Sequence, residues 1–168
     1  YGKKLFKYDP VTNESSIIFE GELIGGFTVQ IDGSLLLFMD KGRISLLKED
    51  SLYDLVPRIE IEESEGNRFN DVSADPEGRV FCGTMSDKTY KGRLYRLDHN
   101  GDLKVILEDV DLSNGIGYSL DLNYMYYTES AAKTIFRYSY DRMSGEITDK
   151  NVFLHTPDEK GIPDGLTV

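Results

Sequence analysis

The feature that most constrains the fold of this chain is a repeat with a period of about 45 residues. Its turn residues Gly33, Gly78 and Asn123 follow one another at intervals of 45 residues. A related alternating segment with a basic residue near its start occurs four times, as KKLFKYD from Lys3, GRISLLK from Gly42, GRLYRLD from Gly92 and KTIFRYS from Lys133. A period of this length with several short strands per repeat is typical of a β-propeller.

A third recurring segment precedes each turn, and it completes the expected repeat unit. It reads GGFTVQ from Gly25, FNDVSA from Phe69, SNGIGYS from Ser113 and IPDGLTV from Ile162. Each unit should therefore hold three short strands and an outer hairpin such as YDRMSGEIT, and Leu94 and Tyr95 should face opposite sides of their sheet. The stretch SLYDLVPRIEIEESEG leaves two options, one helical turn before Pro57 or strand, because RIEIE alternates.

The length of the chain accommodates only part of a closed propeller. Its 168 residues hold about three and a half to four such units. We expect residues 1–168 to form a single all-β propeller domain that is incomplete at both ends, with the first innermost strand before Tyr1 and a new blade begun before Val168. Because a propeller closes by covering its exposed strand edges, a longer chain or a second piece should supply the remaining blades.

The composition of the chain limits the kinds of molecule that it is expected to bind and the compartment in which it is expected to occur. A formal net charge of −11 argues against nucleic acid and anionic membranes as binding partners. No run of 18 apolar residues and no apolar leader segment is present, so we expect a cytoplasmic protein without a membrane span. A lone cysteine, Cys82 within RVFCGTM, excludes an intrachain disulfide and fits a reducing compartment, and its strand pattern predicts a buried structural thiol.

Polar residues mark the start of the innermost strand in successive units. Asn70 with Asp71, Asn114, and Asp164 occupy these positions, and propeller geometry would bring them together at one end of the central channel. Carboxylate and amide oxygens suit hard divalent cations such as Ca²⁺ or Mg²⁺. The alternative is that Asn-Gly and Asp-Gly here form turns and caps only. The two histidines, His99 and His155, are interpreted as solvated or structural.

Arg68 stands at the same strand start as Asn70. Its guanidinium offers forked donors that suit a carbonyl, a carboxylate or several hydroxyl groups of a substrate. The alternative is a surface ion pair with Asp71 or Glu65. The sequence contains no G-x-S-x-G nucleophile elbow, no P-loop and no H-E-x-x-H motif, which argues against those enzyme classes.

These segments together resemble one known family. NRFNDVSADPEGRVFCGTM, GRLYRLD, DLSNGIGYSLDLNYMYYTES, FRYSYDRMSGEITDK and IPDGLTV are similar to the gluconolactonase/regucalcin (senescence marker protein) family, in register from about Gly66 to Val168. The resemblance implies a six-bladed β-propeller with one divalent metal ion in its channel. It also implies hydrolysis of lactones, including aldonolactones, while some members of the family hydrolyse other esters or organophosphates.

The resemblance assigns roles to individual residues. Asn114 matches the metal-binding asparagine of the S-N-G motif, and Asp164 matches a metal ligand that is also the proposed general base. Arg68 and Asn70 match substrate-contacting residues, and Lys88 stands where some animal members carry a substrate-contacting glutamate. The implied cofactor is one divalent ion, Ca²⁺ first, with Zn²⁺, Mg²⁺ or Mn²⁺ as alternatives, and the implied partner is a small-molecule lactone.

The sequence also departs from the family pattern. The metal-binding glutamate of the E-G-P motif would precede Tyr1, and FEGEL near Glu20 lies in an outer-strand context. Glu129-Ser130 stands in place of the usual Asp-Ser. Two other functions therefore remain open at this point, a calcium-binding, non-catalytic propeller of the regucalcin type and a propeller that serves as a protein-interaction scaffold.

Overall fold

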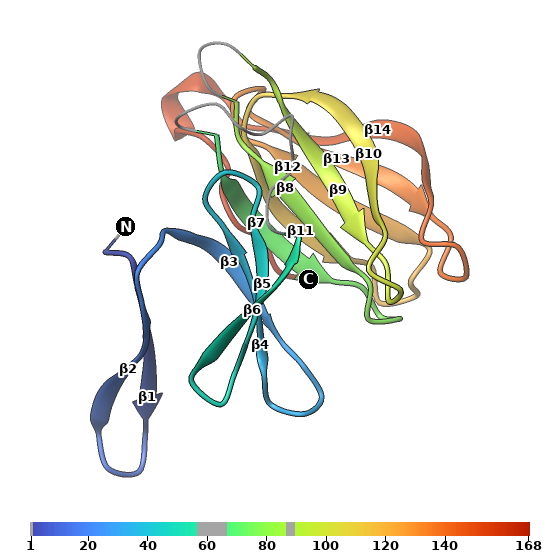
Figure 1. Ribbon diagram of the computed structural model, residues 1–168. Coiled ribbons are helices and arrows are strands. Elements are labelled where there is room, and N and C mark those ends of the chain that lie inside the picture. Colours follow the sequence, from blue (N-terminus) through green and yellow to red (C-terminus); the bar gives the residue numbers. More distant parts are fainter. Residues whose placement is uncertain (1, 57–66, 87–89) are drawn as a thin grey trace.

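A computed structural model describes residues 2–56, 67–86 and 90–168 of the chain, and nearly all of their regular secondary structure is antiparallel strand (Figure 1). The exception is η2, a short 3₁₀ helix at Asp158–Lys160. Within these described ranges no helix has the length and apolar character that a membrane span requires.

Three four-stranded sheets form the bulk of the fold, and each is built from consecutive strands. The first holds β3 (Ile24–Val29), β4 (Leu35–Met39), β5 (Ile44–Lys48) and β6 (Ser51–Val56). The second holds β7 (Phe69–Ala74), β8 (Val80–Thr84), β9 (Gly92–Leu97) and β10 (Leu103–Val110). The third holds β11 (Ser113–Tyr118), β12 (Tyr124–Glu129), β13 (Thr134–Tyr140) and β14 (Ile147–His155).

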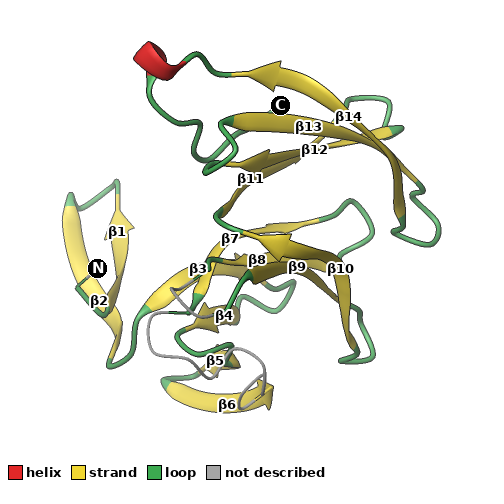
Figure 2. Ribbon diagram, turned by 90° about the horizontal axis from the view of Figure 1, so that it is seen from above, coloured by secondary structure: helices red, strands yellow, loops and turns green. Residues whose placement is uncertain are grey.

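A two-stranded hairpin precedes these sheets, formed by β1 (Lys4–Asp9) and β2 (Glu14–Glu20). It stands to one side of the β3–β6 sheet in both ribbon views (Figures 1 and 2). Leu5 and Phe19 of the hairpin pack against the cluster of Leu37, Met39 and Leu47 from that sheet. Three full sheets and one half sheet agree with the number of repeat units expected from the sequence.

The sheets fan out so that their first strands lie next to one another (Figure 2). β7 lies between β3 and β11, and glycines permit this close approach. A Cβ atom on Gly25 of β3 would lie 1.9 Å from the carbonyl oxygen of Phe69, and one on Gly83 of β8 would lie 1.7 Å from Ser113 Oγ. Side chains at these positions would force the neighbouring sheets apart.

Both faces of the middle sheet are buried, which explains the apolar strands. Leu94 packs toward the β11–β14 sheet, whereas its neighbour Tyr95 packs toward the β3–β6 sheet. The expected opposite orientation of these two side chains is confirmed. Strands buried on both faces read as continuous apolar runs, and VFCGT of β8 is fully buried along its length.

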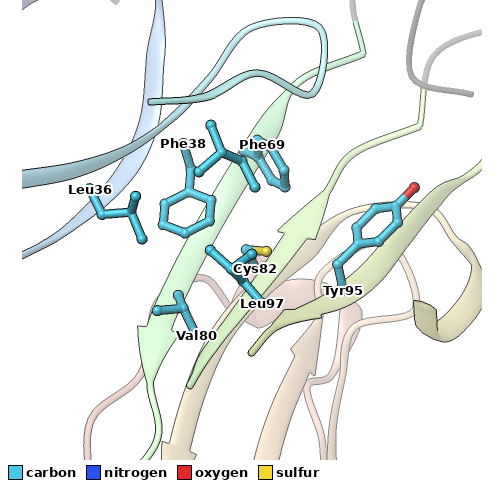
Figure 3. Packing of buried hydrophobic residues seen from close by; sticks show 8 residues of the cluster. Leu36, Phe38, Phe69, Val80, Cys82, Tyr95 and Leu97 are labelled. Carbon is cyan, nitrogen blue, oxygen red and sulfur yellow. The ribbon is translucent and has the colours of Figure 1, made fainter. Parts of the chain in front are cut away.

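The core between the first two sheets is organised around aromatic side chains (Figure 3). Phe38 of β4 meets Phe69 of β7 edge to face, with ring centroids 5.3 Å apart, and Phe69 contacts Tyr95 in a similar geometry. Cys82 lies in the same cluster with no exposed surface, and burial raises the pKa of its thiol well above the usual range. Its prediction as a structural thiol is confirmed by this environment.

The structure decides between the two options for the segment before Pro57 and differs from the expected strand at residues 162–168. Residues before Pro57 form strand β6 and not a helical turn, because Leu52 and Val56 pack onto the first sheet; RIEIE itself lies outside the described residues. The segment from Ile162 to Val168, expected to start a new inner strand, carries no strand assignment. It nevertheless lies beside β11, where Leu166 approaches Gly115 and Gly117.

Candidate functional site

The candidate site lies where the first strands of the second and third sheets begin. Arg68 directly precedes β7, and Asn70 and Asp71 are the second and third residues of that strand. Asn114 is the second residue of β11. Since β7 and β11 lie side by side, residues 44 positions apart in the sequence come into contact there. The expected convergence of these polar residues at one end of the inner strands is therefore observed.

Arg68 and Asn70 are joined by a direct hydrogen bond. Nη1 of Arg68 donates to Asn70 Oδ1 and to the carbonyl oxygen of Phe69, both at 2.9 Å. Asn70 Nδ2 in turn donates to the carbonyl oxygen of Ser113 at 2.8 Å and to Asn114 Oδ1 at 3.1 Å. The Asn70 amide thus links the guanidinium of Arg68 to the start of the neighbouring sheet.

Asn114 is buried, and both ends of its amide have partners. Its Oδ1 accepts from Asn70, and its Nδ2 donates to Ser130 Oγ at 2.8 Å. An amide whose nitrogen is held by a hydroxyl oxygen presents its own oxygen to the opposite side. Asn114 Oδ1 is therefore directed toward Asn70 and the shared ends of the inner strands.

Asp164 reaches the site through its backbone. Its carbonyl oxygen accepts from the backbone nitrogen of Gly115 at 3.3 Å, which holds the segment against β11. A Cβ atom on Gly115 would lie 2.5 Å from the backbone nitrogen of Leu166, so only glycine allows this approach. The side chain of Asp164 is exposed and free to meet solvent or a ligand.

Asp71 provides a second carboxylate close to Asp164. Burial raises the pKa of the Asp71 carboxyl, a hydrogen bond from the backbone nitrogen of Val72 lowers it, and the charge of Asp164 raises it further. The two side chains belong to adjacent segments, since a Cβ atom on Gly165 would lie 3.9 Å from Asp71 Oδ2. A buried carboxyl group whose ionisation is opposed by a nearby negative charge is stabilised by a bound cation or by retaining its proton.

The donor atoms at this place fit a hard divalent cation. Asn114 Oδ1 and the carboxylates of Asp164 and Asp71 are oxygen donors, the type that Ca²⁺ and Mg²⁺ prefer. Within residues 2–56, 67–86 and 90–168, however, no three His, Cys, Asp or Glu side chains gather in a way that could hold a metal ion. The described residues therefore offer at most part of the ligand set that such a cation requires.

The remaining predicted residues lie elsewhere. Lys88, the third expected substrate contact, falls outside the described residues. His99 Nε2 lies 2.7 Å from the carbonyl oxygen of Glu77, and His155 Nδ1 lies 3.1 Å from Thr134 Oγ1, so both histidines have structural contacts away from the site. Glu129 accepts hydrogen bonds from the backbone nitrogens of Leu112 and Ala132. It thereby connects the loop between β10 and β11 to the loop between β12 and β13.

Ser130 also belongs to the site, although no motif in the sequence assigns it a role there. It follows β12, has no exposed surface, and its hydroxyl donates to the carbonyl oxygen of Pro163 at 2.6 Å while accepting from Asn114. The only signal in the sequence is its place beside Glu129 in the Glu-Ser pair.

Comparison with known proteins now identifies the family. The family model described as "SMP-30/Gluconolactonase/LRE-like region" matches residues 1–168. The chain belongs to this family. A pentonolactonase of Haloferax volcanii is 42% identical over 165 residues, which are 98% of this chain and 55% of that protein. Regucalcin of Oryctolagus cuniculus is 28% identical, over 99% of this chain and 58% of the relative.

A solved structure has the same fold as this chain. A calcium-binding protein, regucalcin, from Agrobacterium tumefaciens matches 99% of this chain with a TM-score of 0.87, at 23% identity and over 57% of its own length. This similarity confirms the all-β propeller fold. The chain thus spans somewhat more than half the length of these SMP-30/gluconolactonase/LRE-like proteins.

Proposed function

We propose that the protein is a hydrolase that opens the ring of a sugar lactone with water. The observation that carries this proposal is the hydrogen-bonded convergence of Arg68, Asn70 and Asn114 at the ends of two inner strands, beside the exposed carboxylate of Asp164. Such a set combines forked donors, oriented amides and a base at one place. The pentonolactonase of Haloferax volcanii supports a sugar lactone as the substrate class.

In the proposed reaction, Asp164 acts as the general base, and Arg68 and Asn70 orient the substrate. The Asp164 carboxylate removes a proton from a water molecule, whose oxygen adds to the carbonyl carbon of the lactone. The ring C–O bond then breaks, and the ring oxygen takes up the proton held by Asp164 as it becomes the hydroxyl group of a hydroxy acid. Arg68, with Asn70 fixed beside it, donates hydrogen bonds to the oxygens of the sugar ring and orients the carbonyl group for attack.

A divalent cation fits this arrangement, and we propose Asn114 and Asp164 as the residues of this chain that hold it. Bound there, the cation would polarise the carbonyl oxygen of the lactone. Asp71 is close enough to add negative charge to the same place. Calcium is our first candidate, because the donor atoms are oxygens and a regucalcin of the same fold is described as a calcium-binding protein.

We further propose that other blades of a propeller pack beside the third sheet. The outer face of that sheet has an apolar depression lined by Tyr126, Ile135, Phe153, Leu166 and Val168. Phe153 is 57% exposed and Val168 is 62% exposed. Exposed apolar side chains on a sheet face are typical of a surface that another layer covers, and the longer relatives have the length for such blades.

Hydrolysis of lactones by the full-length natural protein tests the proposed activity. A panel of aldonolactones is assayed with chelator and then with Ca²⁺, Mg²⁺, Mn²⁺ or Zn²⁺ added back. Turnover that stops with chelator and returns with one of the ions is the expected result. Absence of turnover with every ion and every lactone would contradict the proposal.

One variant separates the enzyme from a calcium-binding, non-catalytic propeller. Arg68 lies outside the proposed ligand set, so Arg68→Ala should leave Ca²⁺ affinity close to that of the wild type while turnover falls by about 10²-fold. Equal turnover in both proteins would remove Arg68 from the mechanism. Tight Ca²⁺ binding without any turnover in the wild type would favour the non-catalytic alternative.

A further inference from the structure

Ser130 connects two segments of the candidate site that are far apart in the sequence. Its hydroxyl oxygen accepts from Asn114 Nδ2 at 2.8 Å and its hydroxyl group donates to the carbonyl oxygen of Pro163 at 2.6 Å. Pro163 directly precedes Asp164. The Ser130 hydroxyl therefore contacts one proposed cation ligand, Asn114, and the carbonyl group of the residue that directly precedes the other.

The backbone of Ser130 is itself held on both sides. Its nitrogen donates to the carbonyl oxygen of Leu112 at 3.0 Å, and its carbonyl oxygen accepts from Lys133 at 3.0 Å. The side chain has no exposed surface. A hydroxyl on a fixed backbone, buried between its partners, has little freedom to choose other hydrogen bonds.

A series of hydrogen bonds runs from Arg68 to the carbonyl oxygen of Pro163, and the groups at its two ends determine the direction of each bond. The Arg68 guanidinium can only donate, so it binds Asn70 through Oδ1, and Asn70 Nδ2 is left to donate to Asn114 Oδ1. Asn114 Nδ2 then donates to Ser130 Oγ, and the Ser130 hydroxyl donates to a carbonyl that can only accept. The donor and acceptor roles are thus consistent along the whole series from Arg68 to Pro163.

This order matters for the orientation of Asn114. Without an acceptor at Ser130 Oγ, the Asn114 amide could turn over and present its nitrogen where its oxygen now lies. An amide nitrogen cannot bind a cation, and it would repel the Asn70 nitrogen that now donates to Asn114 Oδ1. The hydroxyl of Ser130 therefore selects the amide orientation that a cation requires.

We propose that Ser130 is a positioning residue of the site, which orients the Asn114 amide and holds the segment of Asp164 at its correct distance from β11. The proposal rests on the proposed function for its effect on catalysis. Its structural part, the tie between the Asn114 amide and the Pro163–Asp164 backbone, stands on the hydrogen bonds alone.

The test compares Ser130→Ala with a matched control in the full-length natural protein. Thr128 lies two residues earlier on β12, is equally buried, and has a hydroxyl for which no hydrogen-bond partner is found. Thr128→Val removes this hydroxyl at constant shape and should change neither activity nor cation affinity. Ser130→Ala should lower Ca²⁺ affinity and kcat each by about 10- to 100-fold, the usual effect of losing a group that orients a ligand.

A merely structural role for Ser130 would lower the urea midpoint and leave Ca²⁺ affinity and kcat of the folded protein unchanged. That result would overturn the proposal. Ser130→Thr, which keeps the hydroxyl, should recover a large part of the lost affinity, whereas Ser130→Cys, a weaker donor and acceptor of similar size, should recover little.

Amide hydrogen exchange decides the structural part without any assay of activity. In Ser130→Ala, exchange of the Gly115 amide should accelerate, because its hydrogen bond to the carbonyl oxygen of Asp164 loses the neighbouring support of Ser130. Unchanged exchange at Gly115 would overturn the proposal even if activity fell. A wild type without lactonase activity would refute the proposed function, and the exchange rates would still determine the role of Ser130.

Discussion

Arg79 and Asp75 form a buried ion pair in which Nε of the guanidinium lies 2.6 Å from Oδ2 of the carboxylate. The pair lies at the end of β7 opposite to Arg68, in the turn that leads into β8. Arg79 also donates to Tyr140 Oη at 3.1 Å and to the carbonyl oxygens of Arg142 and Met143. It thereby fastens the second sheet to the third sheet.

Removing the arginine should destabilise the protein strongly. Arg79→Met leaves the Asp75 carboxylate buried without its cation, and breaking a buried pair in this way typically costs about 3–5 kcal/mol. The free energy of unfolding, measured with urea at neutral pH, checks this value. Lys4→Met, which breaks the exposed pair of Lys4 with Glu20, is the matched control and should have a much smaller effect. Equal losses in the two variants would contradict the argument.

Stability should fall at high pH in a way that depends on Tyr140. Burial, together with the hydrogen bond to Asp75 and its charge, raises the pKa of Tyr140 to about 12, although Arg79 opposes this shift. A phenol in the unfolded chain titrates near pH 10. The folded protein therefore retains a proton that the unfolded chain loses, so the stability from Tyr140 is present below about pH 10 and is lost as the pH rises through about 12.

Tyr140→Phe tests this dependence. The variant should be less stable than the wild type at pH 8, because Asp75 and Arg79 each lose a partner. The difference in free energy of unfolding should narrow as the pH rises above 10. Tyr53→Phe, a change at an exposed side chain, serves as the control. A difference that stayed constant from pH 8 to pH 11.5 would show that Tyr140 titrates normally.

Asp164→Asn should abolish most of the proposed activity. The substitution keeps the size of the side chain but removes both the base and an anionic ligand, so kcat/KM should fall by about 10³-fold or more. The measurement is lactone hydrolysis at saturating metal concentration. Asp158→Asn, at an exposed carboxylate six residues earlier that pairs with Lys133, should keep wild-type activity. Full activity of Asp164→Asn would eliminate Asp164 as the general base.

Gly115→Ala should damage the site without touching a charged group. The added Cβ atom would lie 2.5 Å from the nitrogen of Leu166 and 2.9 Å from the carbonyl oxygen of Asp164, so the Asp164 segment must move away from β11. A displacement of about 1 Å at a catalytic group can cost about 10²-fold in rate. Steady-state kinetics measure the loss, and Gly2→Ala, where nothing lies within 4 Å of the new atom, is the control. Wild-type turnover in Gly115→Ala would show that the Asp164 segment can move away from β11 without affecting catalysis.

The repeat determined most of the fold in advance. Turn residues at intervals of 45 residues and alternating segments between them predicted the strands, because a half-buried sheet requires that periodicity whatever surrounds it. The convergence of Asn70, Asn114 and Asp164 followed from the same spacing, since equivalent positions of neighbouring blades must meet. Leu94 and Tyr95 were assigned to opposite faces for the same local reason.

Contacts between distant segments were decided only by the tertiary structure. The tie from Ser130 to Pro163 and the interaction of Tyr140 with Asp75 join residues 33 and 65 positions apart, and neither pair carries a local signal. The exact register of one sheet against the next determines which polar side chains meet, and that register depends on packing across the whole core. Local chemistry therefore predicted the strands and the place of the site, while the packing of sheet on sheet selected the hydrogen-bond partners within it.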